Sequence, residues 1–140
     1  MRFFTKMEYK QLLDKLYSEI KPVKISERFE VPQARCYAEG NKTMIMNFMQ
    51  ICSALRRDRK HIAKFLMREL AVPAVLEKDR LTLVRKLSLA AINNKISEYA
   101  KEFVICPQCK KPDTELVKEG RFLFLRCLAC GAKHSVRTKI

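Results

Sequence analysis

The sequence predicts an α+β protein made of three consecutive parts, and three observations support this fold class. Apolar residues recur at helical spacing near the start of the chain, and two helical stripes lie between short β-rich runs in its middle. Near the C-terminus, cysteines stand in two C-x2-C pairs, the spacing of a metal-bound module. We expect an amphipathic helix at 1–21, an extended linker at 22–34, a small central α+β domain with antiparallel strands at 35–103, and a four-cysteine module at 104–140.

The N-terminal helix is predicted from one apolar stripe. Its members follow i, i+3, i+4, i+7, i+8 and i+11: Tyr9, Leu12, Leu13, Leu16, Tyr17 and Ile20. Pro22 ends the helix, and the stretch as far as Gln33 indicates an extended connector. A helix held by such a connector either folds back on its own core or docks in a groove of another protein.

Two hairpins are predicted in the central domain. They join the β-rich runs 35–39 with 42–46, and 74–78 with 80–86. Gly40-Asn41 is the turn signal of the first hairpin, and Asp79 lies in the turn of the second. These runs supply the strands of the central domain.

Three helices complete that domain. The predicted helices cover residues 47–57, 59–70 and 89–103. Asp58 and Ser88 precede the second and third helices as N-caps. Cys52 falls on an apolar stripe and is expected in the core, whereas His61 is expected at the surface.

Positive charge is concentrated in the middle and C-terminal parts of the chain. The sequence has 29 Lys and Arg against 15 Asp and Glu, a net charge of +14. The first two predicted helices of the central domain gather the cations Arg56, Arg57, Arg59, Lys60, Lys64 and Arg68. A field of this sign attracts phosphate-rich partners, so the cluster is either a solvated face or a phosphate-binding one.

The sequence also indicates a compartment. It contains no run of 18 apolar residues and no N-terminal signal peptide, so we expect a cytoplasmic protein with no membrane partner. Reduced thiols and metal binding are then the expected state of its six cysteines.

The C-terminal cysteines have the spacing of one structural zinc site. Seventeen residues separate the two pairs, which are Cys106, Cys109, Cys127 and Cys130. Four thiolates close a tetrahedron and leave no open position for catalysis. Two disulfides and a rubredoxin-like iron site are the alternatives.

Three β-rich runs make the four-cysteine module a zinc ribbon. They cover 114–119, 121–126 and 133–138, with Gly120 as the first turn. Because such a module has almost no core, the metal must supply most of its folding free energy. Phe122 and Phe124 either pack under the ribbon or offer stacking surfaces for RNA, beside the cations Arg121, Arg126, Lys133 and Arg137.

Specific motifs occur in order along the chain. The most specific are Cys106-Pro107-x-Cys109-x-x-Pro112-Asp113-Thr114, Lys118-Glu119-Gly120-Arg121-Phe122 and Cys127-x-Ala129-Cys130-Gly131-Ala132. Earlier ones are Tyr9-x-x-Leu12-Leu13-Asp14-Lys15-x-Tyr17, Arg28-Phe29-Glu30-Val31-Pro32, Gly40-Asn41-Lys42-Thr43 and Leu66-x-Arg68-Glu69-Leu70. With these motifs the chain resembles, over essentially its whole length, the beta subunits of archaeal and eukaryotic translation initiation factor 2. It lacks the lysine-block extension of eukaryotic members and so looks archaeal.

The resemblance implies a non-catalytic subunit of a heterotrimer. Members of that family join a GTP-binding gamma subunit and an alpha subunit, and the trimer delivers methionyl initiator tRNA to the small ribosomal subunit. The family's docking element for gamma maps onto Tyr9, Leu12, Leu13, Leu16 and Tyr17. Nucleotide chemistry belongs to gamma, and no Gly-rich phosphate-binding loop is present here. The chain departs from the family at Ala71 and Lys110, where members commonly have Gly.

Two other functions share parts of this pattern. A GTPase-activating initiation factor with the same α+β domain and ribbon would place an arginine, here Arg2, at the GTPase site. A winged-helix and zinc-ribbon transcription factor would read a DNA major groove with its second helix. The amphipathic N-terminal helix favours the beta-subunit interpretation over both.

Overall fold

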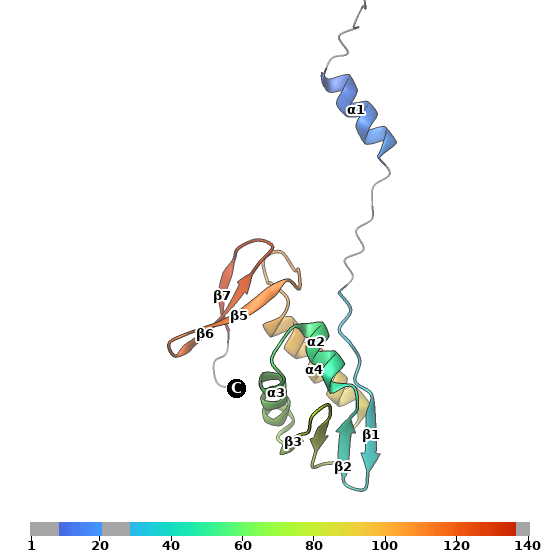
Figure 1. Cartoon of the computed structure of the whole chain (residues 1–140), viewed down its shortest axis with the longest axis vertical. Coiled ribbons are helices and arrows are strands. Elements are labelled where there is room, and N and C mark those ends of the chain that lie inside the picture. Colours follow the sequence, from blue (N-terminus) through green and yellow to red (C-terminus); the bar gives the residue numbers. More distant parts are fainter. Residues whose placement is uncertain (1–8, 21–28, 137–140) are drawn as a thin grey trace, which may run out of the picture.

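The computed structural model describes residues 9–20 and 29–136. Its helices are α1 (Tyr9–Glu19), α2 (Phe48–Leu55), α3 (Arg59–Leu70) and α4 (Leu89–Phe103). Its strands are β1 (Cys36–Glu39), β2 (Lys42–Ile45), β3 (Ala74–Leu76), β4 (Leu81–Leu83), β5 (Thr114–Glu119), β6 (Phe122–Cys127) and β7 (Lys133–Val136). The predicted α+β class is confirmed. Figure 1 shows α1 apart from the other elements.

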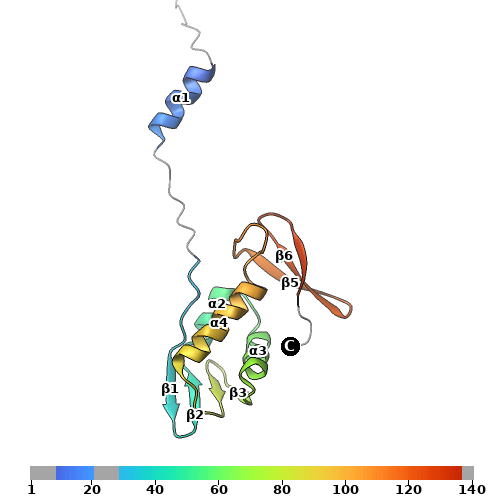
Figure 2. The same ribbon diagram turned by 180° about the vertical axis from the view of Figure 1, so that it is seen from behind.

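The first sheet is built from the two predicted hairpins. Its strand order is β1-β2-β4-β3, and all neighbouring strands are antiparallel. Gly40 has φ +58 at the first turn, a conformation that glycine adopts without steric cost. The second hairpin is shorter than predicted, because only three residues of each run form a strand. Figure 2 shows α2 and α4 between this sheet and the ribbon sheet.

One apolar core joins the first sheet to the helices. Ile45, Leu81 and Leu83 are fully buried on the sheet side. The helices contribute Phe48, Ile51, Leu55, Ile62, Phe65, Leu66, Ile92, Ile96, Tyr99 and Phe103 to the same cluster. Burying each large apolar side chain contributes about 1.5–3 kcal/mol. Cys52 is 3% exposed, which confirms its predicted place in the core.

The helix caps follow the sequence closely. The carboxylate of Asp58 accepts from the Lys60 amide, and the hydroxyl of Ser88 accepts from the Ala91 amide, as predicted. Helix α2 ends at its eighth residue, two positions before the predicted end, because Arg56 takes the left-handed conformation with φ 51. Ala71 closes α3 in the same conformation, with φ 50, at a position where glycine is the usual residue.

His61 is half-buried, which differs from its predicted surface position. Its Nδ1 lies 2.7 Å from the hydroxyl of the buried Tyr99, and its ring contacts the edge of Phe103. Desolvation by burial lowers the pKa of His61. The partner lies 38 positions away in the chain, so no local pattern could have revealed the contact.

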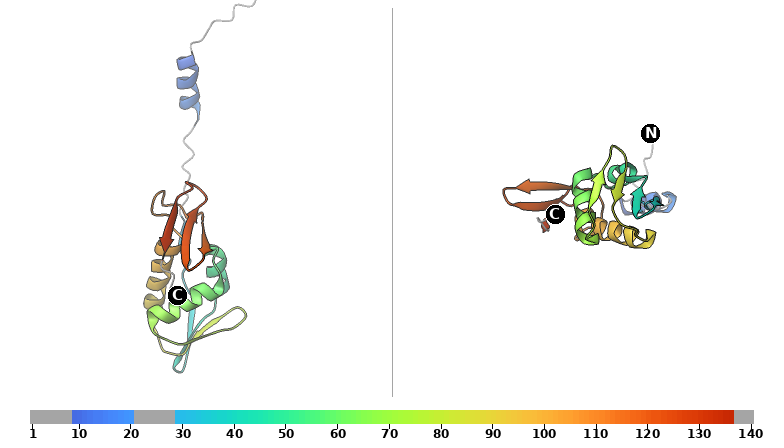
Figure 3. Two further views of the ribbon diagram at one scale, coloured as in Figure 1. Left: turned by 90° about the vertical axis from the view of Figure 1, so that its left-hand side faces the viewer. Right: turned by 90° about the horizontal axis from the view of Figure 1, so that it is seen from below.

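The second sheet is the predicted three-stranded ribbon. Its order is β5-β6-β7, and both pairs are antiparallel. Leu116, Leu123 and Val136 on one face of this sheet are partly buried against the helical core. Figure 3 shows the ribbon extending to one side of the helices, and its strands form a sheet separate from the first one.

Candidate metal centre and interaction surfaces

The four C-terminal cysteines converge as their spacing predicts. All four sulfur atoms lie within 4.8 Å of one another. Cys106 Sγ is 3.7 Å from Cys130 Sγ, and Cys109 Sγ is 3.4 Å from Cys127 Sγ. Sulfurs about 2.3 Å from one tetrahedral zinc ion would be about 3.8 Å apart, so this set fits such an ion. The sulfurs are free thiols and too far apart for a disulfide.

The two cysteine loops have matching backbone geometry. The Lys110 amide donates to the Cys106 carbonyl at 2.8 Å, and the Gly131 amide donates to the Cys127 carbonyl at 3.1 Å. Both donors have positive φ, 57 at Lys110 and 74 at Gly131. Lys110 therefore takes the conformation of a glycine, and its departure from the family pattern leaves the turn intact.

Backbone amides in the second loop favour a charged sulfur at Cys127. The Cys130 amide lies 3.5 Å from Cys127 Sγ and, as the largest cause, lowers the pKa of Cys127 to about 6. The neighbouring Cys109 thiol and the Ala129 amide act in the same direction. The backbone amides of Lys111 and Ala132 lower the pKa values of Cys109 and Cys130, but desolvation and the neighbouring cysteines outweigh them and raise both pKa values. Cys127 is therefore the sulfur that these surroundings favour as a thiolate, the metal-binding form.

The outer face of the ribbon carries the two phenylalanines. Strand alternation places Phe122 and Phe124 together on the side opposite Leu123 and Leu125, and their ring centroids are 6.5 Å apart. Phe122 is 63% exposed, whereas Leu125 is buried. Phe122 therefore does not pack under the ribbon, and Phe124, which is half-buried, lies on the same outer face.

Two of the cations predicted to contact RNA on the ribbon have acidic neighbours. Lys133 Nζ lies 2.6 Å from Glu119 Oε1 and 4.5 Å from the centroid of the Phe124 ring. An Arg126 guanidinium nitrogen lies 3.7 Å from a Glu115 carboxylate oxygen. Arg121 is exposed at the hairpin end, and Arg137 lies outside the described residues.

The cations of the central region fall into different environments. Lys60, Lys64 and Arg68 are exposed and follow one another at i, i+4 and i+8 along α3, so they form one stripe. Arg59 donates to the Lys78 carbonyl at 2.9 Å. Arg56 forms a weak exposed pair with an aspartate of the ribbon, at 3.7 Å.

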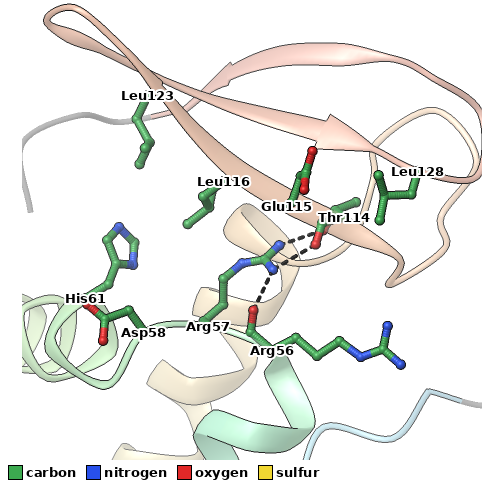
Figure 4. A pocket seen from close by; sticks show the side chains of 9 residues that line it. All are labelled: Arg56, Arg57, Asp58, His61, Thr114, Glu115, Leu116, Leu123 and Leu128. Carbon is green, nitrogen blue, oxygen red and sulfur yellow. Dashed lines mark hydrogen bonds between the residues drawn. The ribbon is translucent and has the colours of Figure 1, made fainter.

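Arg57, grouped with these cations by its sequence position, turns inward. Its Nη2 donates to the Phe103 carbonyl at 2.8 Å and to the Thr114 hydroxyl at 2.7 Å, and its Nη1 donates to the Thr114 carbonyl at 2.8 Å. Figure 4 shows the guanidinium aimed at Thr114. Desolvation by burial lowers the pKa of Arg57. Arg57 therefore joins the ribbon to the helices, and sequence reasoning missed Thr114 as its partner.

A groove of 450 Å³ lies beside this joint. Its lining residues are Arg56, Arg57, Asp58, His61, Thr114, Glu115, Leu116, Leu123 and Leu128. The two arginines are balanced by two carboxylates, and the lowered pKa of His61 keeps its ring neutral near pH 7. The groove is therefore close to neutral, with apolar walls, and does not have the charge of a phosphate site.

Helix α1 presents its apolar residues to solvent. Tyr9 is 79% exposed, Leu16 54% and Tyr17 70%, and no residue of α1 is buried. Leu12 is exposed and Leu13 is half-buried. In the described part of the chain, no helix is both long enough and apolar enough to span a bilayer.

Comparisons with known proteins match most of this chain to one group of translation initiation factors. The family model of a domain found in initiation factors 2B and 5 matches residues 20–133. Translation initiation factor 2 subunit beta of Methanococcus vannielii is 43% identical over 132 residues, which cover 94% of this chain and 96% of the relative. The proteins of the same name from Methanococcus maripaludis strain C5 and Methanococcus aeolicus are 47% identical over 111 residues and 40% identical over 131 residues. They cover 79% and 93% of this chain, and 80% and 94% of the relatives. With a matching family model, near-complete coverage and the four-cysteine ribbon, the chain belongs to the archaeal-type beta subunits of translation initiation factor 2.

Proposed function

We propose that this chain is a non-catalytic subunit of a cytoplasmic heterotrimer and docks on its GTP-binding gamma subunit through α1. The alpha subunit completes the complex, which carries methionyl initiator tRNA to the small ribosomal subunit. Family membership supports the assembly, and the exposed stripe of α1 is the observation that supports the docking mode.

The exposed apolar side chains of α1 support docking through this helix. Leu12, Leu16 and Tyr17 are 49%, 54% and 70% exposed, although they share one face of an amphipathic helix. Transferring each such side chain from water into a groove contributes up to about 1.5–3 kcal/mol. A helix laid in a groove uses i, i+3, i+4 and i+7 anchors, which is the pattern of Tyr9, Leu12, Leu13 and Leu16.

Introducing charge on α1 tests the docking face. Replacing Leu12 and Leu16 by Asp places two carboxylates in the proposed interface and should abolish co-purification with the gamma subunit. The matched control is Gln11→Asp with Ser18→Asp, which adds the same charge on the opposite face of α1. Binding that survives the leucine substitutions, or that is lost equally in both variants, contradicts docking through this stripe.

We further propose that the ribbon holds one structural zinc ion. Cys106, Cys109, Cys127 and Cys130 would be its four ligands, and the ion would supply the folding free energy that the small ribbon core lacks. Metal analysis of the purified chain should return one zinc per molecule. A chain that contains no metal, or iron in place of zinc, would contradict this assignment.

RNA contact is proposed for cations that the structure leaves at the surface. The central set is Arg56, Arg59, Lys60, Lys64 and Arg68, and the ribbon set is Arg121, Arg126 and Lys133. Arg57 is omitted because its guanidinium is already bonded within the chain. The stripe Lys60, Lys64 and Arg68 is the strongest candidate, since its members lie in line at the surface and exposed cations suit phosphates.

A further inference from the structure

One side chain connects three elements that are distant in the sequence. Arg57 leaves the turn between α2 and α3, and its Nε and Nη2 donate to the Phe103 carbonyl at 3.2 and 2.8 Å. Its Nη1 and Nη2 also donate to the carbonyl and hydroxyl of Thr114, at 2.8 and 2.7 Å (Figure 4). The end of α4 and the start of β5 therefore meet at this guanidinium, and the Thr114 hydroxyl also donates directly to the Val104 carbonyl.

The acceptors of Arg57 are adjacent to both halves of the cysteine cluster. Thr114 is the partner of Cys127 in the β5–β6 register. Phe103 lies three positions before Cys106, the first cysteine of the other half. An ion that fixes Cys106 and Cys127 would therefore also fix the two segments to which Arg57 donates.

Burial makes this arrangement dependent on Arg57. Phe103 is fully buried and Thr114 is 5% exposed, although the groove borders Thr114 and Arg57 on one side. The Phe103 carbonyl belongs to the last turn of α4, where the helix itself offers no amide partner. Without Arg57, buried acceptors would lose their donor, which native structures strongly avoid.

We infer that Arg57 couples the metal state of the ribbon to the order of the helical core. With the ion bound, both acceptor segments are held and the guanidinium bonds persist. When the ion is lost, the segments separate, and the last turn of α4 loses its link to the ribbon. This inference rests on the proposed metal site and extends it, because it assigns to a residue outside the ribbon the role of positioning the ribbon.

Hydrogen exchange on the full chain tests the coupling. The test variant is Arg57→Met, which keeps an unbranched stem without the donors. The matched control is Arg56→Met at the adjacent residue, whose side chain is 76% exposed and whose ion pair with Asp113 spans 3.7 Å. Zinc content is measured first, and amide exchange in α4 is then followed before and after removal of the metal by a chelator.

The expected results differ between the two variants. In the wild type and in Arg56→Met, metal removal should speed exchange in the last turn of α4 by about tenfold or more. In Arg57→Met, exchange there should already be fast and should not respond to the metal, while zinc is still bound. Should Arg57→Met fail to fold, Arg57→Lys replaces it, because lysine keeps the positive charge and an unbranched stem but lacks the forked guanidinium donors. Amide exchange in the last turn of α4 should again not respond to removal of the metal.

Two outcomes overturn the inference. The first is a zinc-loaded wild type in which α4 does not respond to metal removal. The second is an Arg57 variant that keeps the wild-type response. A wild type without bound metal refutes the metal site and the coupling together, and the initial metal analysis distinguishes this case from a failure of the coupling alone.

Discussion

The two cysteine loops have matching turns, so the effect of a Cβ at a left-handed position can be tested by removing it in one loop and adding it in the other. Lys110 has φ 57 and Gly131 has φ 74, at equivalent positions after Cys106 and Cys127. A residue with a Cβ in the left-handed region costs about 1–2 kcal/mol. We therefore expect Lys110→Gly to strengthen zinc binding and Gly131→Ala to weaken it.

The size of each effect is set by two opposing terms. Glycine leaves the unfolded chain more freedom, which offsets about 0.4–1 kcal/mol of the left-handed penalty and leaves a net effect near 0.5–1 kcal/mol. No heavy atom lies within 4 Å of a Cβ built at Gly131, so its substitution adds no steric clash. Because zinc binding and ribbon folding share one free energy, this net effect is roughly a two- to fivefold change in the dissociation constant.

Competition with a chromophoric chelator at fixed pH measures these dissociation constants. Lys110→Gly should bind zinc more tightly than the wild type, and Gly131→Ala more weakly. The double variant should lie close to the wild type, since the two effects oppose each other. Weaker binding in Lys110→Gly, or unchanged binding in Gly131→Ala, would refute the argument from backbone strain.

Acidification should destabilise the helical core through His61. Burial lowers the pKa of His61 in the folded state, so the unfolded state binds the proton more readily. The stability that this histidine contributes is present above the unfolded pKa of about 6.5. As the pH drops below that value, the free energy of unfolding falls by up to about 1.4 kcal/mol per pH unit. Thermal unfolding at pH 7 and pH 5 measures this, and His61→Asn should reduce the difference. Tyr99→Phe should lower the free energy of unfolding, measured with denaturant, by about 1 kcal/mol, because His61 loses a hydrogen-bond partner at 2.7 Å. An unchanged free energy of unfolding would show that this hydrogen bond makes no net contribution to stability. Replacing Lys60, Lys64 and Arg68 by Glu should weaken binding to single-stranded RNA. The slope of the logarithm of the binding constant against the logarithm of salt concentration should become shallower by about 2. An unaltered slope would show that the stripe is only a solvated face.

Local spacing was sufficient to predict most elements of this fold. The apolar stripes of α2, α3 and α4, the caps at Asp58 and Ser88 and the turn at Gly40 all depend on neighbours within a few positions. The four sulfurs could be predicted for the same reason, because each C-x2-C pair is a local turn and one ion requires two pairs.

Contacts across the chain could not be predicted in this way. Arg57 and Thr114 are 57 positions apart, and a single sequence gives both a basic cluster and a strand end without linking them. The pairing of Lys133 with Glu119 likewise depends on how the strands of the ribbon come together. Charge alone placed Arg57 and Lys133 among RNA contacts, whereas their environments depend on tertiary packing.

The joint formed by Arg57 combines a permanent cation with neutral oxygens. Although burial lowers its pKa, an arginine side chain stays protonated throughout the cellular range of pH. Its acceptors are carbonyl and hydroxyl groups of Phe103 and Thr114, which neither ionise nor exchange with dissolved ions. The Arg56–Asp113 pair nearby is exposed and open to screening. The Arg57 hydrogen bonds should therefore change little with pH or salt, which leaves the proposed metal ion and binding partners as the agents that can alter how the ribbon is oriented on the helices.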